Sequence, residues 1–102
     1  MHVTQVGLDL NTGGASTEVV LSAASAQGPV VTLPTNHPPG VPVKCLITTD
    51  VTCWLRKGSN PTAVSGTDQK LVAGTYRIEL LVGERIAAIA GGAGTLNFTQ
   101  NS

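Results

Sequence analysis

The sequence predicts an all-β protein, an antiparallel β-sandwich or jelly roll of about eight strands. Short runs of alternating apolar and polar residues recur about every ten to twelve residues, as in all-β domains. Turn-forming stretches such as Asn11-Thr12-Gly13-Gly14 and Gly91-Gly92-Ala93-Gly94 separate these runs. No long window keeps apolar residues at helical spacing without Gly or Pro, so we expect no long helix.

Length and charge limit the possible roles. A chain of 102 residues forms one domain, residues 1–102. Six basic and six acidic residues give no net charge, so electrostatics favours neither nucleic acid nor a membrane surface as a partner. Charged residues make up 12% of the chain, about half the usual globular share, which suggests a surface covered by partner proteins or by further copies in a dimer or trimer.

Targeting and membrane signals are lacking in the pattern of the chain. The N-terminal stretch MHVTQVGLDLNTGG has no basic segment followed by an apolar one, so we expect no signal peptide. No apolar run approaches the ~20 residues that a membrane span requires. Without a secretory signal, Cys45 and Cys53 are expected to be free thiols, and the sequon Asn97-Phe98-Thr99 is expected to be accidental.

The first part of the chain predicts two strands and an arm. Residues 3–10 alternate as a strand, and residues 16–22 form the next one. Residues 23–27 are expected to form a loop or a short helical turn, and residues 30–33 a brief apolar piece. Three prolines and a glycine within residues 34–40 predict an extended, non-hydrogen-bonded surface arm.

The second part is patterned more regularly. Residues 43–48 and 51–56 alternate as strands, with Cys45 and Cys53 on their inward faces. Residues 57–70 are expected to form a long loop. A strand follows with Tyr76, Ile78, Leu80 and Val82 on one face, then a tight turn at Gly83-Glu84. Residues 86–90 read as a central strand, and residues 95–100 close the domain with Leu96 and Phe98 inward.

No group of residues predicts catalysis, a cofactor or a metal ion. His2, His37, Cys45 and Cys53 lack the close pairing of zinc ligands. Arg56 and Lys57 could lower the pKa of a Cys53 thiol, but strand alternation puts Arg56 on the opposite face. The six carboxylates are scattered, and the Gly91–Gly94 stretch lacks the Lys-Ser/Thr and the helix of a phosphate-binding loop.

Trp54 has two interpretations. It shares a face with Thr52 and Arg56, opposite the cysteines. This face is either covered within the protein, by the other sheet or by the loop after Lys57, or it anchors a protein–protein contact, where Trp and Arg are enriched. One Trp, one Tyr and one Phe are too few for an aromatic carbohydrate platform.

Residues 43–100 resemble a type of small structural protein found in tailed bacteriophages and prophages. The resemblance rests on TTDVTCWLRKGSNPTA followed by LVAGTYRIELLVGERIAAIAGGAGTLNFTQ. These motifs correspond to the family's Cys-aromatic-aliphatic-Arg-x-Gly, Asn-Pro-Thr-Ala, Leu-x-Ala-Gly and Gly-Thr-Leu-x-aliphatic-Thr. Residues 1–42 lie outside the resemblance and read as a variable N-terminal part that includes the arm.

The resemblance implies a non-enzymatic capsid decoration or cement protein, made in the host cytoplasm and located on the capsid surface of the virion. Its partners would be the major capsid protein or other virion proteins. The alternative is a neck, tail or fibre component, including a receptor- or carbohydrate-binding module. The candidates for partner contact lie on the Trp54 face, the following loop and the arm. They are Trp54, Arg56, Asn60, Pro61, Pro34, His37, Pro38 and Pro39.

Overall fold

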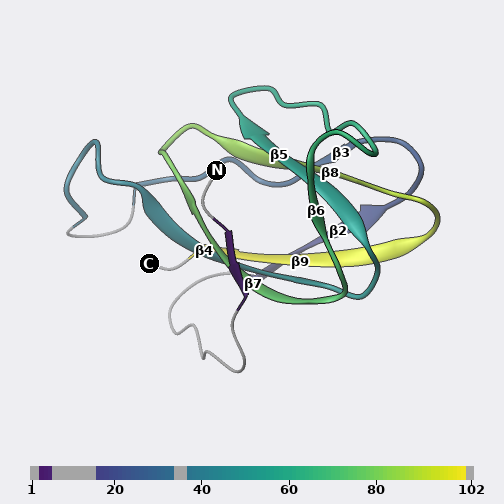
Figure 1. Ribbon diagram of the computed structural model, residues 1–102. Helices are drawn as coiled ribbons and strands as arrows, with labels where there is room; N and C mark the ends of the chain where they lie inside the picture. Colours follow the sequence, from purple (N-terminus) through teal and green to yellow (C-terminus); the bar gives the residue numbers. More distant parts are fainter. Residues whose placement is uncertain (1–2, 6–15, 34–36, 101–102) are drawn as a thin grey trace.

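A computed structural model of the chain describes residues 3–5, 16–33 and 37–100 and shows an all-β protein (Figure 1). No helix occurs within these residues. The strands are β1 (Val3–Gln5), β2 (Ser16–Leu21), β3 (Ala26–Gln27), β4 (Val43–Thr49), β5 (Cys53–Gly58), β6 (Gln69–Leu71), β7 (Gly74–Leu80), β8 (Arg85–Ala90) and β9 (Gly94–Gln100). The predicted fold class, an antiparallel β-sandwich, is therefore confirmed.

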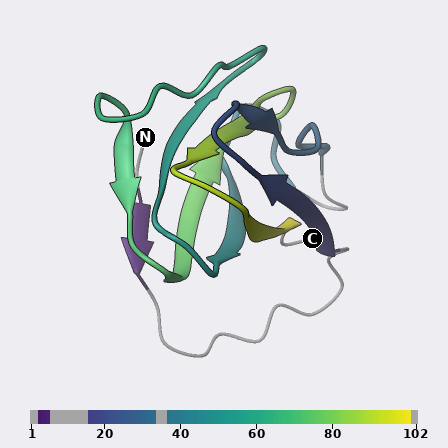
Figure 2. The same cartoon turned by 90° about the vertical axis from the view of Figure 1, so that its right-hand side faces the viewer.

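The strands form two sheets that face each other (Figure 2). Sheet A has the order β1-β7-β4-β9-β2, and sheet B has the order β3-β8-β5-β6. From β2 onward the pairing is nested and antiparallel: β2 with β9, β3 with β8, β4 with β7, and β5 with β6. The chain is thus one long antiparallel hairpin folded over on itself, and the pairs β4–β9 and β5–β8 complete the sheets.

Alternation along the strands builds the core between the sheets. In β4 the burial pattern alternates along the whole strand, which puts Val43, Cys45 and Ile47 inside. Ile47 lies opposite both Tyr76 and Phe98 in the neighbouring strands of sheet A. The buried apolar residues from both sheets form one cluster, so the described parts of the chain fold around a single core.

The turns follow the predicted chemistry. Gly83 in the β7–β8 turn has φ +91°, a left-handed conformation that favours glycine. The Glu84 amide donates to the Leu81 carbonyl at 3.0 Å, which closes this turn. Residues 91–93 connect β8 to β9 as a bend between strands, in agreement with the interpretation of the glycine-rich stretch.

Several element boundaries differ from the predictions. Strand β1 covers residues 3–5 of the predicted strand 3–10, and residues 6–10 lie outside the described residues. Residues 26–27 form a short strand, where a loop or helical turn was expected, because they pair with Ala87 and Ala88 of β8. The loop after β5 is shorter than predicted, since β5 continues to Gly58 and β6 begins at Gln69.

The apolar residues around the β3–β4 and β7–β8 connections also differ from the predictions. Residues 30–33 contain no strand, although the Val31 amide donates to the Glu84 carbonyl and the Val31 carbonyl accepts from the Gly83 amide. Val82 was expected inside with Leu80. It is exposed, because β7 ends at Leu80 and the chain turns.

Candidate interaction surface

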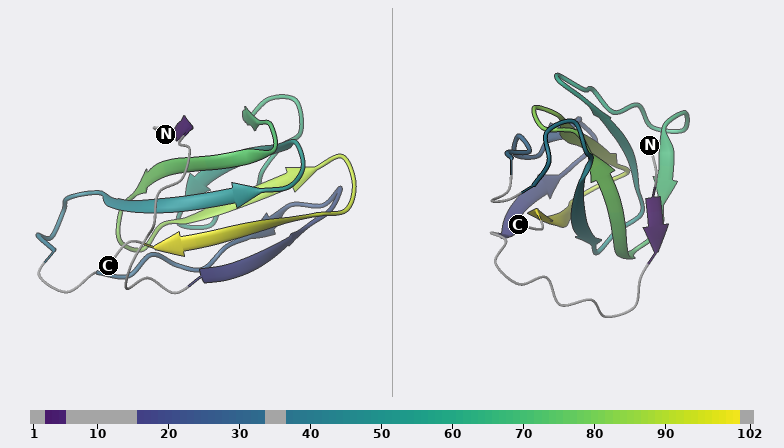
Figure 3. Two further views of the ribbon diagram at one scale, coloured as in Figure 1. Left: turned by 90° about the horizontal axis from the view of Figure 1, so that it is seen from below. Right: turned by 90° about the vertical axis from the view of Figure 1, so that its left-hand side faces the viewer.

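Residues 59–68, between β5 and β6, cross the outside of sheet B (Figures 2 and 3). We call this segment the strap. Ala87 lies on the outer side of β8, between the inward residues Ile86 and Ala88, yet its exposed fraction is 0%. Pro61 and Ala63 of the strap are buried as well. The strap therefore covers part of the outer face of sheet B.

Side chains from β3 and from the residue before it hold the strap. The Gln27 amide nitrogen Nε2 donates to Asn60 Oδ1 at 2.9 Å and to the Pro61 carbonyl at 2.8 Å. Gln27 Oε1 accepts from Arg85 Nη1 at 3.2 Å, so the amide of Gln27 is held at both ends. The Ala63 amide donates to Ser25 Oγ at 2.9 Å.

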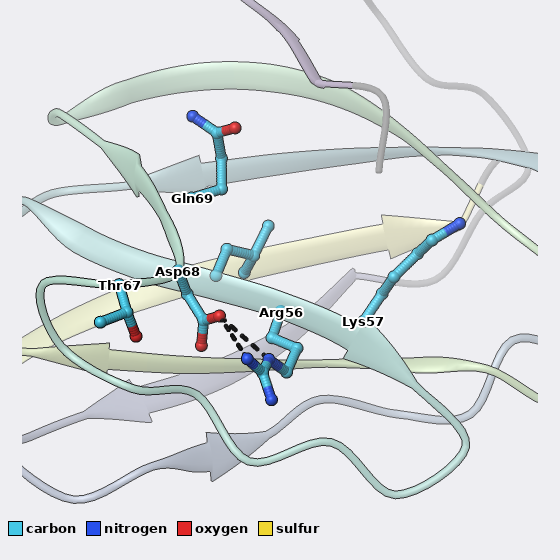
Figure 4. A pocket seen from close by; sticks show the side chains of 6 residues that line it. Arg56, Lys57, Thr67, Asp68 and Gln69 are labelled. Carbon is cyan, nitrogen blue, oxygen red and sulfur yellow. Dashed lines mark hydrogen bonds and ion pairs between the residues drawn. The ribbon is translucent and has the colours of Figure 1, made fainter.

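The other end of the strap is fixed by Asp68. Asp68 Oδ1 accepts from Arg56 Nε at 3.0 Å and lies 2.8 Å from Arg56 Nη2 (Figure 4). Asp68 Oδ2 accepts from the Val64 amide at 2.7 Å. Both carboxylate oxygens are thus engaged within the protein, and the ion pair neutralises the charge of Arg56.

An open hollow of about 390 Å³ surrounds this ion pair. Its lining residues are Leu55, Arg56, Lys57, Thr67, Asp68 and Gln69. In Figure 4 the Lys57 side chain points away from the Arg56–Asp68 pair, and its Nζ lies 3.7 Å from Glu84 Oε1. The lining offers no pair of free titratable groups within hydrogen-bond distance, so this geometry provides no general acid and base.

Trp54 lies on the outer face of sheet B, as strand alternation predicted. In the sheet it is opposite Lys70 of β6 and Ile89 of β8. Its side chain is half-buried, whereas the next outward residue of β5, Arg56, is exposed. Both interpretations of Trp54 thus keep a structural basis: the strap covers the neighbouring Ala87, and part of the indole still faces solvent.

The candidates on the strap and Arg56 of β5 beside it are engaged within the protein. Asn60 and Arg56 are exposed but hydrogen-bonded to Gln27 and Asp68, and Pro61 is buried. Gln27, Ser25 and Asp68, which hold the strap, were not predicted as site residues. Nothing in the local sequence marks them, since Gln27 and Ser25 reach partners 33 to 38 residues away.

The arm is more structured than predicted. His37 Nε2 lies 2.9 Å from the Val41 carbonyl oxygen, and the Val41 amide donates to the Pro38 carbonyl at 3.4 Å. Gly40 has φ +80°, which allows the tight turn between them. The expectation of a non-hydrogen-bonded arm over residues 34–40 is therefore wrong at His37 and Pro38, which both bond to Val41 just after it. Pro38 and Pro39 are exposed, and Pro34 lies outside the described residues.

The two cysteines are buried and unpaired, as predicted. Burial raises the pKa of Cys45 from 9.0 to about 12. Burial also raises the pKa of Cys53, and a hydrogen bond with the Thr49 side chain lowers it in part. A thiol with a raised pKa is a poor nucleophile at neutral pH, so the geometry gives no support to a catalytic Cys53.

The described residues contain no group of three or more His, Cys, Asp or Glu side chains placed to hold a metal ion. Among them there is also no helix long and apolar enough to cross a membrane. Comparison of the chain with protein-family models, curated proteins and solved structures gave no match.

Proposed function

We propose that the protein is a non-enzymatic structural protein of a tailed-phage virion, a decoration or cement protein that binds the major capsid protein lattice. The observation that carries the proposal is the nested antiparallel pairing of the eight strands from β2 through β9, in which the first pairs with the last and each later strand with the next one inward. We interpret this pairing as a jelly roll, an architecture that recurs in viral capsid proteins, lectins and cupins. A shared fold does not by itself define a function, so the surface of the protein must decide among these classes of protein.

The outer face of sheet A supports a role in protein contact. Thr48 of β4 lies between Thr75 of β7 and Asn97 of β9, and the Oγ1 atoms of the two threonines are 3.2 Å apart. At one end of the same face, Lys44 lies opposite Glu79 in register. A face that carries threonines, an asparagine and an oppositely charged pair suits contact with another protein surface better than contact with a polyanion.

Weak contacts of this kind gain strength by repetition. A decoration protein meets the same neighbours many times around a shell, so modest individual interfaces suffice for stable attachment. The resemblance of residues 43–100 to small phage structural proteins points the same way. The low charge of the chain is consistent with surfaces that are covered in the assembled particle.

Copy number in purified particles tests the proposal. Quantitative mass spectrometry of the virion should find this protein in a fixed ratio to the major capsid protein, as expected for a component bound across the lattice. Only a handful of copies per particle would assign it to the neck, tail or fibre instead. Its absence from purified particles would contradict a virion role altogether.

A further inference from the structure

The strap, which crosses the outside of sheet B in Figure 2, is held in two different ways along its length. Residues 64–68 form a turn that is closed on itself, because the Asp68 amide donates to the Val64 carbonyl at 3.2 Å and the Val64 amide donates to Asp68 Oδ2 at 2.7 Å. The ion pair between Asp68 and Arg56 fastens this turn to β5. Within the described residues, no backbone-to-backbone hydrogen bond fixes residues 59–63. We call residues 59–63 the lid.

Side chains from β3 and from the residue before it tie the lid down. Gln27 Nε2 donates to Asn60 Oδ1 and to the Pro61 carbonyl, and Ser25 Oγ accepts from the Ala63 amide. Hydrogen bonds of this kind contribute little net stability where water replaces them on opening. Strand β3 has two residues and is the last strand of sheet B, so the support of the lid is itself short.

Little apolar surface holds the lid closed. Pro61 and Ala63 are its buried residues, and they lie on the side of sheet B where Ala87 is covered. Asn60 and Thr62 are exposed. The free energy gained by burial scales with the apolar area removed from water, and one proline and two alanines offer small side chains.

Arg85 keeps an unpaired donor beside the closed lid. Arg85 lies opposite Gly58 in the sheet, and a Cβ atom at Gly58 would lie 3.8 Å from Pro61 Cβ, so Pro61 folds back over this pair. Arg85 Nη1 donates to Gln27 Oε1, but Arg85 Nε is buried and has no hydrogen-bond partner within the described residues. A buried N–H group without a partner costs free energy, and hydration on opening would remove that cost.

We propose that the lid opens by itself, pivoting at Gly58 and between Ala63 and Val64, while the sandwich and the turn of residues 64–68 stay folded. Opening admits water to Arg85 Nε and uncovers the outer side of Ala87. Gln27 and Ser25 are the latch of the closed state. The outer face of sheet B thus has a covered form and an uncovered form, whether or not the protein belongs to a virion.

Two adjacent amides on either side of the pivot test the proposal by residue-resolved hydrogen exchange. The Ala63 amide is bonded to Ser25 and belongs to the lid, whereas the Val64 amide is bonded to Asp68 and belongs to the turn. The Gly28 amide, which donates to the Ile86 carbonyl at 2.9 Å, reports on the sandwich. After correction for intrinsic rates, we expect Ala63 to exchange at least about tenfold faster than Val64 and Gly28, because it is released by the smallest opening.

The variant Arg85→Lys tests the physical cause. It keeps the positive charge and removes Nε, so closing the lid no longer buries an unpaired donor. We expect exchange at Ala63 to slow by at least about fivefold, with Val64 unchanged. Lys70→Arg is the matched control, because Lys70 is an exposed residue of β6 opposite Trp54, and it should leave the exchange of Ala63 as it is. Urea unfolding would verify that each variant is folded, and Arg85→Met would replace Arg85→Lys if it is not.

Three results would overturn the proposal. Equal exchange at Ala63 and Val64 would show that the strap moves as one piece. Exchange at Ala63 as slow as at Gly28 would show that the lid opens with the sandwich and not by itself. Unchanged or faster exchange at Ala63 in Arg85→Lys would show that the unpaired Nε does not favour opening.

Discussion

Asp68 and Arg56 form an ion pair on the outside of sheet B, with Asp68 Oδ1 at 3.0 Å from Arg56 Nε and 2.8 Å from Nη2. The two side chains differ in exposure, at 9% for Asp68 and 51% for Arg56. Asp68 also accepts the Val64 amide, so it ties the end of the strap both to β5 and to the middle of the strap. Arg56 stays accessible on one side.

Replacing Asp68 should cost more stability than replacing Arg56. Asp68→Ala removes the partner of Arg56 and also leaves the Val64 amide without its acceptor, so we expect a loss of about 1–2 kcal/mol in the free energy of unfolding. Arg56→Gln removes only an exposed ion pair, which is worth less than about 1 kcal/mol. Urea unfolding of both variants measures the difference, and a larger effect of Arg56→Gln would contradict this account of the strap.

Gln27 should control how firmly the strap is held. In Gln27→Ala the Asn60 side chain and the Pro61 carbonyl lose their donor, and Arg85 Nη1 loses its acceptor. We expect faster amide hydrogen exchange in residues 59–68 and a loss of about 1–2 kcal/mol in stability. Gln69→Ala is the control, because the Gln69 amide contacts only the adjacent Lys70 carbonyl. Equal exchange in the two variants would show that Gln27 does not hold the strap.

The sequence was sufficient for the sandwich because its strands are patterned by local alternation. The structure buries all four residues expected to point inward, Cys45, Cys53, Leu96 and Phe98. Side chains alternate between the two faces of a strand, so one inward residue implies that the residues two positions away point inward too. The strap illustrates what local patterning cannot predict. Its Gly, Pro and Ser residues indicate a loop, but its attachment depends on Ser25 and Gln27 of a distant strand region.

Other predictions from the sequence failed for a related reason. Strand β3 has only two residues and exists because it pairs with β8, so no alternation marks it in the sequence. Val82 continues the alternation of Tyr76, Ile78 and Leu80, but the turn at Gly83 reverses the chain before Val82 can enter the core. The turn within residues 37–41 depends on a His37 side-chain contact that proline content alone does not predict.

Gly94 should tolerate no side chain. A Cβ atom at this position would overlap the Val51 side chain, and its neighbourhood also includes Asp50 Oδ1, which accepts from the Thr95 amide. Gly94→Ala is therefore expected to destabilise the protein by about 1–3 kcal/mol. Gly92→Ala serves as the control and should change stability little, because a Cβ atom at Gly92 would meet no heavy atom within 4 Å. Comparable melting temperatures for the two variants would disprove the close contact at Gly94.

Stability should fall in alkaline solution through Cys45. Its pKa is about 12 in the folded protein against 9.0 for the unperturbed thiol, because burial disfavours the thiolate. Below pH 9 both states keep the proton, so this contribution to stability is complete. Between pH 9 and 12 only the unfolded chain ionises at Cys45, and the free energy of unfolding falls by up to about 1.4 kcal/mol per pH unit.

The variant Cys45→Ala isolates this contribution. It should be less stable than the unmodified protein at neutral pH, because a buried sulfur atom is lost, but its stability should fall less steeply above pH 9. Urea unfolding at a series of pH values measures both slopes, and the other titrating groups are shared by the two proteins. If the slopes were equal, the Cys45 thiol would ionise alike in the folded and unfolded states, and its burial in the core would be refuted.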